Sequence, residues 1–189
     1  CLAEFDRVQG MAGANETLAW RGVVDSRFGI YSSLYRMLKD KRGAAPTEER
    51  MQAAEAELLR NARSLWRFDN LGALELMAQV QHFGGPTRLL DVTFSPLVAL
   101  WFAVENSSGE VPGVPESDGR IIIFNVTDRM VHLDDDWGDK SLPWAALEDS
   151  AWRECLPYVW RPPVFNERIS AQDSAFLMGG VPKSFKGCN

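Results

Sequence analysis

The segment QHFGGPTRLLD, residues 81–91, gathers three side chains that can do chemistry, His82, Arg88 and Asp91. Glycine reaches backbone angles that other residues resist, and proline fixes one angle, so the GGP turn should hold these side chains in defined directions. We expect a positive φ at Gly85 in this turn. Two interpretations stay open: Arg88 and Asp91 brace each other while His82 caps the preceding helix, or Arg88 is held in position for an anionic ligand.

A second arginine raises the same choice. Arg21 lies in AWRGVV, a run typical of a strand, and an arginine is costly to bury unless it meets a carboxylate, a group of carbonyls or an anionic ligand. Gly22 follows it and should let another group approach the backbone closely. Arg21 therefore either pairs with Asp91 or Asp173 in the core, or binds the phosphate of a ligand.

Composition limits the functions that these residues can serve. The chain has 189 residues, 46% apolar and 24% charged, which predicts one globular domain over residues 1–189. Its net charge of −6 argues against binding nucleic acid mainly through phosphate neutralisation. Cys1, Cys155 and Cys188 form no CxxC motif, and the acidic stretch at 134–136 is typical of a solvated turn, so we expect no metal and a reducing cytoplasm. No apolar run is long enough to span a membrane.

Three helices should position the candidate residues. Thr47 can cap a helix over 47–69, and a second helical pattern covers 71–81. In the first helix, apolar residues recur at spacings of three and four, which predicts a buried stripe: Met51, Ala54, Leu58, Ala62 and Leu65. A third helix should start at Ser95-Pro96 and run to 106, and because it is apolar nearly all the way round, we expect it to be central and buried.

Strand patterns complete the expected fold. TLAWRGVV at 17–24 suits a strand, GRIIIFNV at 119–126 is typical of an interior strand, and RISAQDSAFLMGG at 168–180 should form a turn and a final strand. The fold class is therefore mixed α/β, in the α+β sense. We expect a small, largely antiparallel sheet flanked by helices, with one central buried helix.

Four segments resemble a known family. WRG at 20–22, SSLYR at 32–36, the block from AQVQHFGG to WFAVE at 78–105, and RISAQDSAF at 168–176 are similar to the FRG domain, which takes its name from an aromatic-Arg-Gly motif. The resemblance covers nearly the whole chain and implies a bacterial or phage protein with no settled activity. The sequence departs from the family at Val23, where glutamine is usual, at Val92, where an aromatic is common, and at 173–174, where Asp-Ser replaces a Gln-Gly pair.

The order of three short motifs also resembles ADP-ribosyltransferases. This resemblance implies NAD as a substrate and a toxin-like effector in conflict between phage and host. By that analogy Arg21 would hold the pyrophosphate or ribose, Tyr31 and Ser32 would line the nicotinamide pocket, and Gln172 or Asp173 would occupy the late strand position. The sequence lacks the glutamate that such enzymes carry at the last motif.

A noncatalytic module that recognises a protein or a nucleic acid is the alternative. A pocket that joins Arg21, Tyr31, Arg88 and Gln172 would favour the enzyme and a nucleotide or other anionic small molecule as its partner. An exposed face rich in tryptophan and arginine would favour the binding module. The local candidates for that face are Trp152, Arg153, Trp160 and Arg161.

Overall fold

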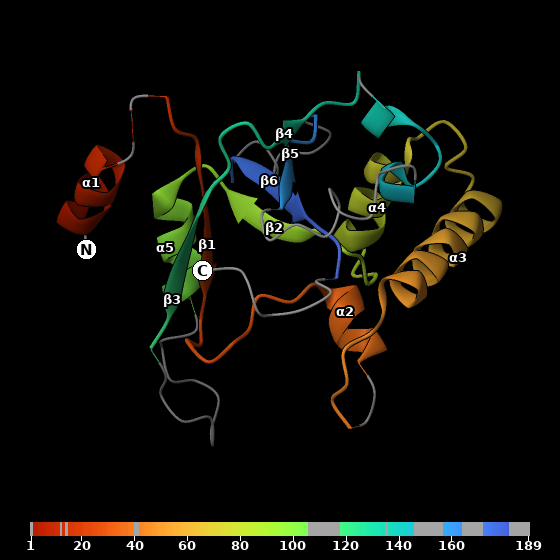
Figure 1. Ribbon diagram of the computed structural model, residues 1–189, viewed down its shortest axis with the longest axis horizontal. Coiled ribbons are helices and arrows are strands. Elements are labelled where there is room, and N and C mark those ends of the chain that lie inside the picture. Colours follow the sequence, from red (N-terminus) through yellow and green to blue (C-terminus); the bar gives the residue numbers. More distant parts are fainter. Residues whose placement is uncertain are drawn as a thin grey trace. The chain divides into compact units, whose positions relative to one another are not determined.

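A computed structural model describes residues 2–11, 13, 15–39, 42–105, 118–134, 136–145, 157–163 and 172–181 (Figure 1). The chain forms two compact units, the first from residues 1–30, 91–130 and 163–175, and the second from 31–90, 131–162 and 176–189. Each unit is described by itself below. The single domain expected over residues 1–189 stays a prediction.

The described strands pair in the order β3-β1-β2-β6-β5-β4. Pairing is antiparallel between β1 and β2, between β1 and β3, and between β5 and β6, so the largely antiparallel sheet and the mixed α+β class are confirmed. The strand bounds are β1 Leu18–Val23, β2 Leu90–Thr93, β3 Arg120–Asn125, β4 Met130–Val131, β5 Tyr158–Trp160 and β6 Ser174–Met178. The helices are α1 Leu2–Met11, α2 Ser33–Leu38, α3 Glu48–Trp66, α4 Ala73–His82 and α5 Pro96–Val104, with short 3-10 turns at Asp136–Gly138 and Pro143–Ala145.

In the first unit, β1 and β3 lie side by side along their whole length, in register from Leu18 opposite Asn125 to Val23 opposite Arg120 (Figure 1). Trp20 is almost fully buried, and its ring meets that of Phe5 edge-on, with the centroids 5.6 Å apart. The expectation that β3 is an interior strand was wrong. Among the described strands it lies at one edge of the sheet, where β1 is its neighbour.

Helix α5 starts as expected, since the Ser95 hydroxyl accepts a hydrogen bond from the Val98 N–H at 3.4 Å. Its burial on all sides was a wrong prediction. Ala99 and Ala103 are its buried residues, whereas large apolar side chains on the remaining surface are exposed: Leu97, Trp101 and Val104. Hydrophobicity alone suggested a central helix, but the small alanines pack against the sheet because they allow the two backbones to come close.

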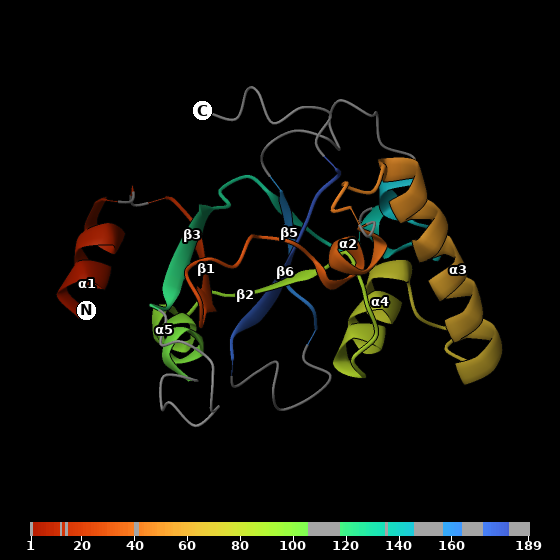
Figure 2. The ribbon, with the colours of Figure 1, turned by 90° about the horizontal axis from the view of Figure 1, so that it is seen from below.

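In the second unit, α3 and α4 lie side by side around a core that includes Leu59, Leu74 and Met77 (Figure 2). Thr47 caps α3 as expected, accepting a bond from the Arg50 N–H at 3.3 Å. Among the described residues, no helix is both long and apolar enough to cross a membrane.

Candidate functional site

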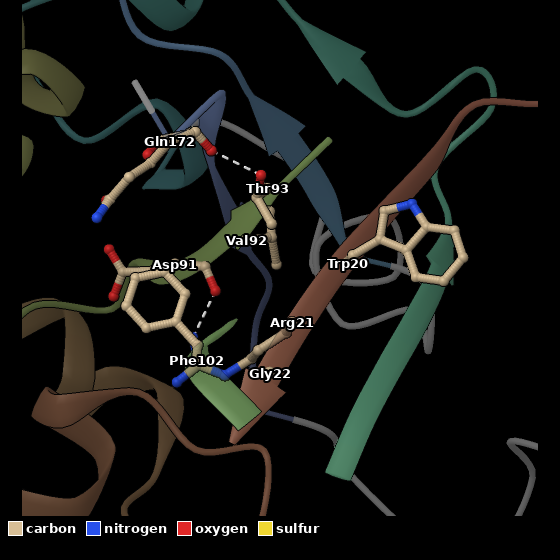
Figure 3. Close-up of a pocket in the computed structure, with 9 residues that line it drawn as sticks. Trp20, Arg21, Gly22, Asp91, Val92, Thr93, Phe102 and Gln172 are labelled. Carbon is tan, nitrogen blue, oxygen red and sulfur yellow. Dashed lines mark hydrogen bonds between the residues drawn. The ribbon is translucent and has the colours of Figure 1, made fainter. Parts of the chain in front are cut away.

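A cavity of about 170 Å³ opens in the first unit (Figure 3). Strands β1 and β2, helix α5 and the start of β6 supply its walls. The described residues that line it are Trp20, Arg21, Gly22, Asp91, Val92, Thr93, Phe102, Gln172 and Ser174. Two candidate residues that stand far apart in the sequence, Arg21 and Gln172, thus share one cavity.

The alternation of a strand places Arg21 at this cavity. Successive side chains of β1 point to opposite faces, so the Trp20 ring packs into the core while the side chain of Arg21 extends the other way (Figure 3). The Nη1 atom of Arg21 donates a hydrogen bond to the main-chain oxygen of Asp91 on β2. A guanidinium carries five N–H donors, so an arginine can bind several partners at once.

Hydrogen bonds from residues 93 and 94 hold the turn that contains Gln172. The Thr93 hydroxyl donates to the main-chain oxygen of Gln172 at 2.6 Å, and the Phe94 N–H donates to the Asp173 oxygen at 3.1 Å. Asp173 has a φ of 44°, a left-handed conformation that costs energy for a residue with a side chain. Of the two residues expected at the late position, Gln172 lines the cavity, while Asp173 forms the strained turn beside it.

Gly22 lets another group approach its backbone closely, as expected. A Cβ atom at Gly22 would lie 1.8 Å from the Ala99 oxygen and 2.8 Å from the Ala103 nitrogen of α5. The group that approaches its backbone is therefore helix α5, and Gly22 contributes only main-chain surface to the cavity.

Arg88 lies in the second unit and is only 3% exposed. Its Nε and Nη2 atoms donate to Glu55 at 2.6 and 2.8 Å, and its Nη1 atom donates to Glu48 at 3.1 Å. Trp144 donates to Glu55 at 3.1 Å, and the Val181 N–H donates to Glu48 at 2.8 Å. Expected to brace Asp91 or to hold a ligand, Arg88 is instead matched by two buried carboxylates of α3, which sequence analysis missed.

The electrostatics of this cluster follow from one cation facing two anions. Burial lowers the pKa of Arg88, but the hydrogen bonds to Glu55 and Glu48 together with the negative charges of these two residues outweigh burial and raise that pKa. Burial raises the pKa of Glu55 despite the bonds from Arg88 and Trp144, and the nearby Glu48 charge adds to the rise. The second unit therefore binds a proton at Glu55 more readily than the unfolded chain does.

This raised pKa predicts a pH effect on stability. Glu55 should contribute stability that is fully present below the ordinary pKa that it has in the unfolded chain and is lost as pH rises through its higher folded pKa. The free energy of unfolding, measured by urea titration from pH 4 to 8, should fall more steeply in the wild type than in Glu55→Gln. The exposed Glu57→Gln on the same helix should keep the wild-type slope, and equal slopes in all three proteins would contradict the prediction.

Tyr31 and Ser32 lie at the start of α2, also in the second unit. The Ser32 hydroxyl caps the helix by accepting from the Tyr35 N–H at 3.2 Å, and the Tyr31 ring stacks on Tyr35 with the centroids 4.9 Å apart. Burial and the neighbouring Tyr31 raise the pKa of Tyr35. Ser32 thus has a structural role, while the expected contribution of both residues to a nicotinamide pocket stays a prediction.

The GGPT turn differs from expectation at one residue. The positive φ belongs to Gly84, at 83°, and not to Gly85, where a Cβ would instead lie 2.4 Å from the Val80 side chain. Thr87 bonds back to the backbone as expected, accepting from the Leu89 N–H at 3.2 Å. His82 is the last residue of α4, and its ring meets that of Phe83 edge-on, while its expected role in binding stays a prediction.

The size and chemistry of the cavity restrict what it can hold. Sites for drug-sized ligands measure about 300–1,000 Å³, so a cavity of about 170 Å³ admits a single ring or a group of similar size. Within the described ranges, no group of three or more His, Cys, Asp or Glu side chains could hold a metal ion.

A comparison with family models supports the resemblance to the FRG domain. Residues 16–110 match the family model described as FRG domain. The matched segment contains both WRG and QHFGGPTRLLD, and it ends before Gln172. No curated protein and no solved structure matches the chain.

Proposed function

The chain belongs to the FRG domain family, and from this premise we propose that its first unit binds one end of a nucleotide in the cavity beside Arg21. The observation that supports the proposal is that Arg21 and Gln172 line the same cavity. These are the residues expected on the first strand and at the late strand of an NAD-binding site. NAD is accordingly the candidate substrate, and transfer of its ADP-ribosyl group to a target is the candidate reaction.

Each residue has a defined task in this proposal. NAD would supply a glycosidic bond that breaks with its electron pair on the departing nicotinamide, while a nucleophile of the target bonds to the freed ribose carbon. Arg21 anchors the nucleotide through charged hydrogen bonds, held in direction by its bond to the Asp91 carbonyl. Phe102 supplies an apolar wall, and the Gln172 amide offers a donor and an acceptor.

The biological setting that accompanies this proposal is a bacterial or phage effector that acts in the cytoplasm during conflict between phage and host. The resemblance to toxin-like transferases suggests that setting. The cysteine pattern, without a CxxC motif, is compatible with a reducing compartment.

Substitution of Arg21 tests the proposal. We expect Arg21→Ala to weaken NAD binding about 10- to 100-fold in calorimetry, because a hydrogen bond to a charged group contributes about 1.5–3 kcal/mol. Arg21→Lys should restore only part of the affinity, since lysine keeps the charge but loses the planar fork. The melting temperature should change little, because Arg21 is only half-buried and lies beside a cavity.

Arg27→Ala is the matched control. Arg27 lies in the same unit and is paired with Asp25, and neither residue is among those that line the cavity. This variant should bind NAD as the wild type does. A wild-type protein that binds neither NAD nor ADP-ribose, or an Arg21→Ala variant with unchanged affinity, would refute the proposed function.

A noncatalytic recognition module is the second candidate, and one observation favours it. Helix α5 exposes Leu97, Trp101 and Val104, an apolar stripe with the spacing of a helix that packs against a partner protein. The tryptophan face expected from the sequence is not supported at Trp160, which is buried, and Trp152 and Arg153 lie outside the described residues. Absence of nucleotide binding by the wild type would favour this candidate.

A further inference from the structure

We infer that Asp91 makes the cavity specific for a neutral planar group that carries a hydrogen-bond donor beside an acceptor, and that phosphates of the same ligand stay outside the cavity. A carboxamide-substituted ring and the edge of a nucleobase both belong to this class. The inference rests on the proposed nucleotide function and goes further by stating which part of the ligand enters.

The charges of the residues that line the cavity disfavour a phosphate. Among the described lining residues, Arg21 is the one cation and Asp91 is the one anion, so their formal charges cancel. A negatively charged phosphate of the ligand would be attracted by Arg21 but repelled by the Asp91 carboxylate in the same small space. A neutral group with both a donor and an acceptor meets no such repulsion.

The position of Asp91 allows its carboxylate to contact a ligand. Its main-chain oxygen accepts the bond from Arg21, which ties the Asp91 backbone to β1, while its side chain is exposed. Figure 3 shows the side chains of Asp91 and Gln172 extending in the same direction, away from the Trp20 ring. Since a carboxylate accepts about four hydrogen bonds, Asp91 can accept from a ligand in addition to its protein partners.

The size of the cavity and its apolar wall favour a ring as the group that enters. A volume of about 170 Å³ suits one aromatic ring, and the Phe102 ring offers an apolar surface for it. The amide or amino N–H of such a ring can donate to Asp91, and the adjacent carbonyl or ring nitrogen can accept from Arg21 or Gln172. The ionised phosphates of a dinucleotide have acceptors alone and so offer no donor to the Asp91 carboxylate.

Binding of fragments to the full chain tests this inference. Nicotinamide, adenosine and inorganic pyrophosphate are titrated separately and followed by ligand-observed NMR, with NAD titrated in parallel by calorimetry. We expect nicotinamide or adenosine to bind the wild type at least about tenfold more tightly than pyrophosphate does. Comparing nicotinamide with adenosine shows which end of the nucleotide enters.

Asp91→Asn should reverse this preference, because it removes the negative charge and adds an N–H donor. Affinity for the preferred ring should fall at least about tenfold, while pyrophosphate should bind more tightly than it does to the wild type. Asp118→Asn, an exposed substitution in the same unit with the same change of charge, should leave the ranking of ligands as it is in the wild type.

The outcomes separate the two proposals. If NAD binds but pyrophosphate binds the wild type as tightly as both rings do, the inference about Asp91 is wrong while the proposed function stands. An unchanged ranking in folded Asp91→Asn also overturns the inference. If NAD and all three fragments fail to bind the wild type, both proposals are wrong. The wild-type ranking decides the matter even if Asp91→Asn does not fold.

Discussion

Arg88→Met should lower the free energy of unfolding by about 3–5 kcal/mol. The substitution keeps much of the side-chain volume but removes the cation that faces Glu55 and Glu48, which are 0% and 3% exposed. Breaking a buried ion pair by removing one partner is costly, because the remaining charge has been taken out of water without compensation. The Trp144 ring, 5.2 Å from the Arg88 guanidinium, makes tryptophan fluorescence a suitable probe during urea denaturation.

The loss should shrink as pH falls from 8 to 5, because the orphaned Glu55 avoids the cost of a buried charge by taking up a proton. Arg60→Met provides the control, since Arg60 is exposed on the same helix and its replacement should change stability by less than about 0.5 kcal/mol. Equal stability of Arg88→Met and Arg60→Met would show that the buried cluster does not hold the second unit together.

Gly22→Ala should cost about 3 kcal/mol or more, because the added methyl group meets atoms that cannot rotate away. Its Cβ would lie 1.8 Å from the main-chain oxygen of Ala99, so β1 and α5 would have to separate. Overpacking a well-packed interior typically costs about 1–3 kcal/mol, and a backbone obstacle places this site at or above the upper end. Fluorescence of the buried Trp20 during urea unfolding reports on this unit.

Two other glycines make the test specific. Gly119→Ala should be destabilising in the same way, since its Cβ would lie 2.1 Å from the Ala103 oxygen. Gly10→Ala should be neutral or stabilising by up to about 1 kcal/mol, because no atom lies within 4 Å and alanine favours a helix more than glycine does. A Gly22→Ala protein as stable as Gly10→Ala would rule out close packing between β1 and α5.

Much of the local structure follows from local signals in the sequence. Thr47 and Ser95 cap the helices where their side chains predict, and the apolar runs around Trp20 and Phe176 form the expected strands. These features depend on neighbouring residues, through capping bonds and the period of apolar side chains. The sequence also singled out Arg21, because an arginine in a strand is costly to bury without a partner, whereas Gln172 was implied by the resemblance to ADP-ribosyltransferases.

The burial of α3 shows where local signals fail. Its apolar stripe predicted Leu65 in the core, whereas Leu65 is 74% exposed and Glu55 is fully buried on the inner face. A glutamate is a surface residue by default, and its burial becomes favourable only beside Arg88, 33 residues further along the chain. No period within the helix can reveal a partner supplied by tertiary folding.

The sequence by itself therefore determined the fold class and the positions of helices α3, α4 and α5. Only the tertiary structure decided which charges meet. It paired Arg88 with Glu55 and Glu48, and it set Asp91 beside Arg21 at one cavity. The physical reason is that a capping bond or an apolar period is encoded within a few residues, whereas the energy of a buried charge depends on groups that only the folded chain brings together.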